Sequence, residues 1–210
     1  AVTLSWNPSK TVKDSSDLGH RDSTAWWCWH DSPSCSNNID YYEATDNIVN
    51  YVIAMMNTKT YEYDEVWLPH DAVAHTFQTR RSTLEQMLDA GFPCMVVPKL
   101  SKQHGIDAAR KVLPLCTINS VACYDGIEAL RAYKRKFNEL TKAFSETPEH
   151  SWASNGADAF RYMSLVCMEK SAVKAAARKQ EPIIKPPEYT LDKLWKDREG
   201  SGHRYEKLRM

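Results

Sequence analysis

Three short acidic motifs are spread along this chain of 210 residues: DLGHRDSTAW with Asp17, VWLPHDA with Asp71, and SNGADAFRY with Asp158. Each places an aspartate at the edge of an expected regular element, two at strand ends and one in the first turn of a helix. Carboxylates at three such edges can converge on a divalent cation. A cation held in this way activates water for phosphodiester hydrolysis. The pattern indicates metal-dependent hydrolysis, on the condition that the fold brings the three edges together.

Each aspartate also has an ordinary structural interpretation. Asp17 precedes Leu18-Gly19, where an aspartate commonly bonds the backbone of its own turn. Asp71 follows a strand and fits an Asx-turn or a helix N-cap, although ligand sites also gather at the carboxyl ends of strands. Asp158 would complement the dipole of a helix capped by Asn155. One motif alone is weak evidence, and the case rests on all three occurring in this order.

The elements that must position these acids change in pattern along the chain. Residues 11–30 are expected to form two strands around the turn at Leu18-Gly19, and IDYYEAT a third strand, in an antiparallel meander. Ser82 and Glu85 predict a capping box at a helix start. The later elements are helices at 47–56, 82–90, 106–112, 126–140 and 156–178, strands at 65–68 and 94–98, and a short hairpin at 141–150. This order predicts an α/β fold, a ribonuclease H-like mixed sheet flanked by helices.

Composition bounds the architecture. The chain is 42% hydrophobic and 26% charged, which fits one large domain with a tail. From residue 180 onward prolines and charges replace apolar residues, so we expect a folded domain at 1–179 and a flexible tail or docking arm at 180–210. The sequence contains neither a membrane-spanning apolar run nor a signal-peptide layout. Because Ala1 is not an initiator methionine, we expect a processed product or an excised domain.

Charge is distributed unevenly. The net charge is zero, but residues 1–75 carry 4 Lys/Arg against 11 Asp/Glu, and residues 76–210 carry 23 against 16. An acidic metal-binding half joined to a basic half that faces phosphate would have this distribution. Solvated surface would produce it as well, so the asymmetry is supporting evidence only.

The cysteines and histidines do not have the spacings of the common zinc sites. The six cysteines form no C-x-x-C pair and are interpreted as reduced thiols. His70 and His75 are five residues apart, whereas a zincin helix needs a spacing of four, so a zinc site is not predicted. We expect His70 to support Asp71 or to be exposed.

Asp22 is a candidate fourth metal ligand that would act through a bound water. An exposed turn residue is an equally good interpretation of Asp22.

The three motifs, in this order, resemble the nuclease domain of phage terminase large subunits, the motors that package and cut viral DNA. The resemblance runs from about Val12 to Tyr162 and is closest to headful-packaging podoviruses of enterobacteria. It includes D-L-G followed by D-S-T-A, the apolar strand leading into H-D-A, and G-A-D-A-F-R-Y. Two departures are visible: Lys13 to Ser16 are polar where related chains are apolar, and Asn155 stands where many carry His.

The resemblance implies an endonuclease for double-stranded DNA, acting at the start and end of packaging. Asp17, Asp71 and Asp158 would be catalytic ligands of two Mg²⁺ or Mn²⁺ ions. The implied partners are DNA, the portal protein, the small terminase subunit, and an ATPase domain of the same polypeptide, whose G-x-x-x-x-G-K-[ST] motif this chain lacks. The implied location is the bacterial host cytoplasm, transiently the portal vertex of the procapsid, with no membrane. Candidate DNA-backbone contacts are Arg80, Arg81, Lys99 and Lys102.

Two other functions stay open at this point. A Holliday-junction resolvase or a transposase would use similar acids on a similar sheet, and a preference for branched DNA would reveal a resolvase. A non-catalytic docking module would use the acids only as caps and turns, and would bind Mn²⁺ no better than its Asp17→Ala variant.

Overall fold

The computed structural model describes residues 4, 6–19, 23–45, 49–75, 80–179 and 196, with the backbone alone for 173–179. The chain divides into two units, Ala1–Ala172 and Val173–Met210, and the three acidic motifs belong to the first. Asp22 and nearly all of the expected tail lie outside the described residues. Among the helices that are described, none is long and apolar enough to cross a membrane.

A six-stranded mixed sheet forms the centre of the first unit, in the order β5-β4-β1-β2-β3-β6. Strands β1, β2 and β3 form the predicted antiparallel meander, and β4 joins β1 in parallel. Strands β5 and β6 extend the sheet in parallel to β4 and β3. The predicted ribonuclease H-like sheet is confirmed. The strands are β1 (Val12–Asp17), β2 (Thr24–Asp31), β3 (Ser36–Ala44), β4 (Tyr63–Leu68), β5 (Cys94–Val96) and β6 (Thr117–Ile118).

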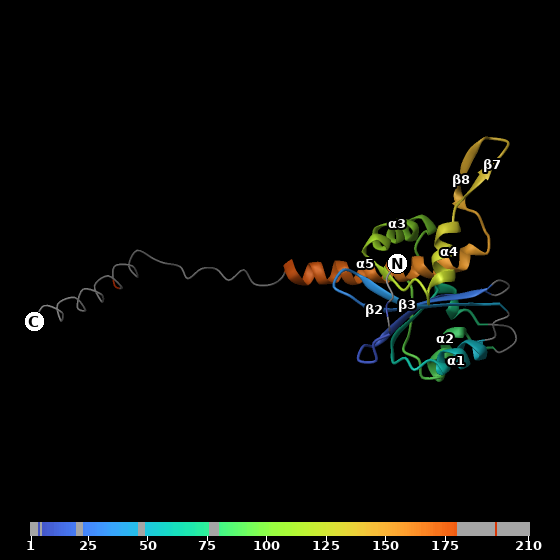
Figure 1. Cartoon of the computed structure of the whole chain (residues 1–210). Coiled ribbons are helices and arrows are strands. Elements are labelled where there is room, and N and C mark those ends of the chain that lie inside the picture. The colour runs from blue at the N-terminus through green and yellow to red at the C-terminus, as the bar shows by residue number, and fades with distance from the viewer. Residues whose placement is uncertain are drawn as a thin grey trace, which may run out of the picture. The chain divides into compact units, whose positions relative to one another are not determined.

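Helices cover both faces of the sheet (Figure 1). Successive side chains of a strand point to opposite faces, so Trp26 packs with Val52 of α1 while Trp27 packs with Phe160 of α5. Helices α1 and α2 lie on the first face, and α3, α4 and α5 on the second. Their bounds are α1 (Val49–Thr58), α2 (Thr83–Asp89), α3 (Lys102–Val112), α4 (Tyr124–Ala132) and α5 (Ala153–Lys179), with short 3-10 turns η1 (His70–Val73) and η2 (Leu113–Leu115).

Strand β1 is polar yet buried, and it leads directly to Asp17. The ammonium of Lys13 lies 2.6 Å from a carboxylate oxygen of Asp31 and 3.3 Å from one of Glu65. The hydroxyl of Ser15 donates to the carbonyl of Ala159 at 2.9 Å. Burial, followed by repulsion from Asp40, raises the pKa of Asp14 well above its usual range, which favours the neutral form of this side chain. The strand forms despite its polar sequence because neighbouring elements bond Lys13 and Ser15, while Oδ1 of Asp14 is buried without a hydrogen-bond partner among the described residues.

One predicted helix is wrong in its second half. The helix expected at 126–140 ends at Ala132, and the chain continues as β7 (Arg135–Asn138) and β8 (Ala143–Pro148), a hairpin that begins before the predicted 141–150. The rings of Phe137 and Phe144 pair across the strands with centroids 5.1 Å apart. The side-chain carbonyl of Asn138 accepts from the amides of Leu140 and Thr141 and closes the turn. These cross-strand and turn contacts outweigh the helical pattern.

Helix starts follow their caps. The predicted capping box of Ser82 and Glu85 at α2 is confirmed. Helix α3 begins at Lys102, four residues before the expected start, because the hydroxyl of Ser101 accepts from the amide of His104. Helix α5 begins at Ala153, so the expected cap Asn155 lies inside its first turn and Asp158 lies beyond that turn. Strand β6, only two residues long, was not predicted.

Candidate active site at the carboxyl edge of the sheet

Asp17 and Asp71 lie at the same edge of the sheet. Asp17 is the last residue of β1, and Asp71 lies in η1, which follows β4 directly after Pro69. Strands β1 and β4 are parallel neighbours, with Ser15 opposite Trp67. The carboxyl ends of parallel neighbours meet at one edge, so the fold brings these two acids to the same side. The N-cap of η1 is Pro69, so Asp71 does not serve as the expected cap.

Two buried hydrogen bonds position Asp158 over this edge. The indole N–H of Trp27 donates to the carbonyl of Gly156 at 2.9 Å, and the hydroxyl of Ser15 donates to the carbonyl of Ala159. A Cβ atom at position 156 would lie 2.5 Å from the hydroxyl of Tyr41, so glycine permits the close approach of α5 to the sheet. The bonds bracket Asp158 and fix its turn of helix against β1 and β2.

Electrostatics couple the three acids. The pKa of Asp17 rises to about 7, first because burial disfavours the carboxylate and then because of repulsion from Asp158. Repulsion from Asp71 raises this pKa further, while Arg161 and Lys102 lower it. Asp17 is therefore within electrostatic range of both other acids and of two cations. A divalent cation would relieve this repulsion.

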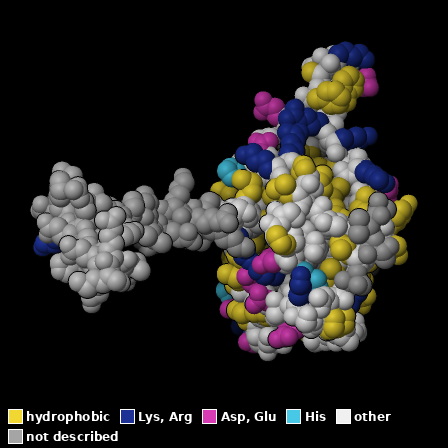
Figure 2. All heavy atoms as spheres, turned by 60° about the vertical axis from the view of Figure 1, so that its left-hand side comes forward, with side chains coloured by type: hydrophobic (Ala, Val, Ile, Leu, Met, Phe, Trp, Pro, Cys, Tyr) yellow, Lys and Arg dark blue, Asp and Glu magenta, His cyan; other side chains and the backbone are white. Residues whose placement is uncertain are grey.

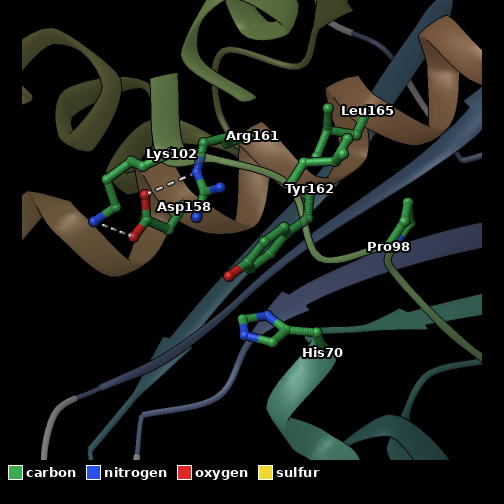
Figure 3. Close-up of a pocket in the computed structure, with 8 residues that line it drawn as sticks. His70, Pro98, Lys102, Asp158, Arg161, Tyr162 and Leu165 are labelled. Carbon is green, nitrogen blue, oxygen red and sulfur yellow. Dashed lines mark hydrogen bonds and ion pairs between the residues drawn. The ribbon is translucent and has the colours of Figure 1, made fainter. Parts of the chain in front are cut away.

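Asp158 is bonded on both of its oxygens. The oxygen Oδ1 accepts from the Nε–H of Arg161 at 3.2 Å and from the hydroxyl of Tyr133 at 3.3 Å. The oxygen Oδ2 lies 3.2 Å from the ammonium of Lys102. Figure 3 shows Lys102 and Arg161 approaching this carboxylate from α3 and from α5 itself.

A cavity of about 260 Å³ opens beside Asp158. In Figure 3 the ring of His70 and the hydroxyl of Tyr162 face each other across it. Its wall thus combines a carboxylate, two cations and polar rings, which suits a charged oxygen-rich ligand better than an apolar one. Eight residues line it: His70, Pro98, Leu100, Lys102, Asp158, Arg161, Tyr162 and Leu165.

The donor set fits a hard divalent cation. All three side chains offer carboxylate oxygens, the ligands that Mg²⁺ and Mn²⁺ prefer, and after burial their mutual repulsion is a further cause of the raised pKa of Asp17. In the part of the chain that is described, no three His, Cys, Asp or Glu side chains are gathered tightly enough to hold a metal as they stand. The carboxylate of Asp158 is engaged by cations of the chain itself. Binding would therefore require a local rearrangement of side chains.

The predicted DNA contacts separate into two groups. Lys102 lines the cavity and contacts Asp158, whereas Arg80, Arg81 and Lys99 are exposed and do not line it. Arg81 forms an ion pair with Asp89 on α2.

His70 and His75 have different surroundings. His70 lines the cavity, and its expected support of Asp71 stays a prediction. The ring of His75 lies 3.6 Å from a carboxylate oxygen of Glu85.

Two residues around Asp158 were not predicted. Arg161 lies one helical turn after Asp158 in the motif ADAFRY, a spacing that places both on one face of a helix and that could have revealed it. Tyr133 is 25 residues from Asp158 in sequence, and no local pattern identifies it.

The β7–β8 hairpin carries a basic and aromatic surface. Figure 2 shows Lys and Arg side chains gathered on the hairpin and at its base. Lys134, Arg135 and Lys136 line a shallow hollow together with Phe137 and Phe144. Lys134 forms an ion pair with Glu149 at 3.8 Å. Exposed cations beside exposed rings suit a nucleic-acid backbone and its bases.

Comparison with solved structures reveals similar folds. The P22 large terminase nuclease domain superimposes with a TM-score of 0.57 at 18% identity, covering 81% of this chain and 87% of that one. The chain has the fold of large-terminase nuclease domains. That of bacteriophage SPP1, solved with bound Mn, gives a TM-score of 0.56 at 14% identity over 77% of this chain and 86% of that one.

Longer relatives extend beyond this chain. The large terminase of a thermophilic bacteriophage, solved in complex with ADP, has a TM-score of 0.62 at 14% identity and is matched over 80% of this chain. The match spans 42% of that longer terminase. No family model matches the sequence, and no curated protein matches it significantly. At these identities the likeness establishes the fold, and the chemistry must be argued from the residues of the site.

Proposed function

We propose that this chain is the metal-dependent endonuclease domain of a viral DNA-packaging terminase large subunit, cutting double-stranded DNA when packaging begins and ends. The observation that carries the proposal is the placement of Asp17 and Asp71 at the ends of the parallel neighbours β1 and β4, with Asp158 on a turn of α5 that is hydrogen-bonded to β1 and β2. Acids that served only as caps and turns would not need to meet. Asp158 lies beyond the first turn of α5 and Asp71 is not the N-cap of η1, so the docking-module interpretation loses its main support.

In this proposal Asp17, Asp71 and Asp158 hold two divalent cations, Mg²⁺ or Mn²⁺. The cations would activate the attacking water and stabilise the departing oxygen of the DNA backbone. Arg161 and Tyr133 hold Oδ1 of Asp158 in place. The rigid β1–β4 edge sets the direction of the other two acids. Lys102 and the basic hairpin side chains Lys134, Arg135 and Lys136 are candidates for phosphate contacts, which fix position and not sequence.

The partners follow from the same proposal. Double-stranded DNA is the substrate, and an ATPase domain in the same polypeptide would hold it, as the partial coverage of the longer ADP-bound terminase suggests. The portal protein and the small terminase subunit are further proposed partners, with residues 180–210 as the docking tail of a nuclease domain at 1–179. The proposed location is the host cytoplasm, and the portal vertex during packaging.

The direct test is a plasmid-cleavage assay with Mn²⁺, Mg²⁺ or EDTA. We expect the wild-type chain to nick and linearise plasmid DNA with either metal and to be inactive in EDTA. Single Asn substitutions of Asp17, Asp71 and Asp158 should each abolish cutting, because the three acids act as a unit. The matched control is Glu62→Gln, which neutralises an exposed carboxylate elsewhere in the first unit.

The outcomes separate the alternatives. Cleavage restricted to four-way junctions would favour a resolvase. Equal Mn²⁺ binding by the wild type and Asp17→Ala would favour a docking module. Cutting by Asp158→Asn at the wild-type rate would remove that residue from the proposed mechanism.

A further inference from the structure

The two cations on Asp158 differ in how firmly they are held. The side chain of Arg161 is 8% exposed, and its guanidinium lies 4.5 Å from the ring centre of Tyr162. A Cβ atom at position 105 would overlap the stem of Arg161, so this arginine lies tightly against α3. The side chain of Lys102 is 50% exposed. Arg161 is therefore fixed, whereas Lys102 can leave.

The position of Lys102 in its helix also favours exchange. It is the first residue after the N-cap Ser101, where the helix dipole disfavours a positive charge. Its ammonium is a strongly hydrated point charge on a flexible stem, unlike the planar guanidinium of Arg161. The ion pair with Oδ2 of Asp158 offsets the unfavourable dipole, and a phosphate in the cavity would do the same.

The two oxygens of Asp158 thus have separate partners. Arg161 and Tyr133 occupy Oδ1, and Lys102 alone occupies Oδ2 among the described contacts. A divalent cation and an ammonium cannot both lie on Oδ2, because they would compete for the same lone pairs and repel each other. Asp158 lines the cavity, and Oδ2 is therefore its oxygen whose cationic partner is half exposed and exchangeable.

We propose that Lys102 is an exchangeable counterion that couples metal binding to DNA binding. Without DNA its ammonium remains on Oδ2 of Asp158 and competes with the divalent cation. A DNA phosphate in the cavity draws the ammonium away and frees Oδ2 for the metal. This inference rests on the proposed nuclease function and adds a regulatory role for one residue. By thermodynamic reciprocity, DNA should strengthen metal binding and metal should strengthen DNA binding by the same factor.

The test measures Mn²⁺ binding from the electron paramagnetic resonance signal of free Mn²⁺, with and without a short DNA duplex. Phosphorothioate linkages in the duplex resist cleavage. Without DNA, Lys102→Met should bind Mn²⁺ about two- to fivefold more tightly than the wild type, because a competing ion pair has been removed. The duplex should tighten Mn²⁺ binding by a similar factor in the wild type and by little in Lys102→Met. Lys102→Arg keeps the charge, so without DNA it should bind Mn²⁺ no more tightly than the wild type does.

The control is Lys111→Met, an identical change at an exposed lysine of the same helix. It removes the same net charge and should bind Mn²⁺ as the wild type does. Equal or weaker Mn²⁺ binding by Lys102→Met would overturn the counterion role. A wild-type chain that neither binds Mn²⁺ nor cuts DNA would refute the nuclease function itself. A wild type that cuts DNA while Lys102→Met binds Mn²⁺ unchanged would refute this inference alone.

Discussion

Removing the charge of Asp17 should stabilise the metal-free protein while abolishing its activity. The folded-state pKa of Asp17 is about 7 against an ordinary value of 3.8, so the folded chain binds this proton more tightly than the unfolded chain does. Stability at this site is then greatest below about pH 4 and falls as the pH rises towards 7. Asn resembles the protonated side chain and does not titrate, so the stability of Asp17→Asn does not fall in this way as the pH rises.

The magnitude follows from the pKa difference. About three pKa units at about 1.4 kcal/mol each give at most about 4 kcal/mol of destabilisation in the wild type above pH 7. For a chain of this size 1 kcal/mol corresponds to a Tm change of about 2–4 °C. We therefore expect Asp17→Asn to melt as much as about 8–16 °C above the wild type at pH 8 in EDTA, and within about 2 °C of it at pH 4.

The assay is thermal unfolding followed by circular dichroism at pH 4 and pH 8, in EDTA and in Mn²⁺. Saturating Mn²⁺ at pH 8 should raise the Tm of the wild type more than that of Asp17→Asn, because only the wild type keeps all three carboxylates. Glu62→Gln should leave the Tm nearly unchanged at both pH values. A Tm difference between Asp17→Asn and the wild type that is the same at pH 4 and pH 8 would refute the electrostatic argument.

Three further predictions test the site and its supports. Asp71→Asn should lose plasmid cleavage with Mn²⁺ and keep its circular dichroism spectrum; residual cutting near the wild-type rate would exclude Asp71 as a ligand. Gly126→Ala would place a Cβ atom 2.6 Å from the ring of Trp27, so it should lower the free energy of unfolding by about 1–3 kcal/mol, measured by urea titration; an unchanged midpoint would contradict the tight packing of α4. A chain ending at residue 179 should nick plasmid DNA at the wild-type rate but lose binding to the portal protein; lost nicking would refute the proposed division.

The sequence alone determined those features that depend on short-range signals. The capping box of Ser82 and Glu85 predicted the start of α2, because both hydrogen bonds join residues within one turn. The strand-strand-helix order of the acids, with the resemblance of their motifs, predicted the ribonuclease H-like sheet. The assignment of Asp17, Asp71 and Asp158 as metal ligands stays a prediction, supported by their coupling at one edge.

Only the tertiary structure decided which side chains surround those acids. The sequence offered Lys102 and Lys99 alike as candidate phosphate contacts, yet the fold brings Lys102 and not Lys99 onto Asp158. Tyr133, the C-cap of α4, bonds the same carboxylate, and the helical pattern expected through Leu140 gave no sign of this contact. Such contacts depend on how elements pack, and no local propensity encodes them. The chemistry of the three acids can be read along the chain, but the cations that restrain them are set by the fold.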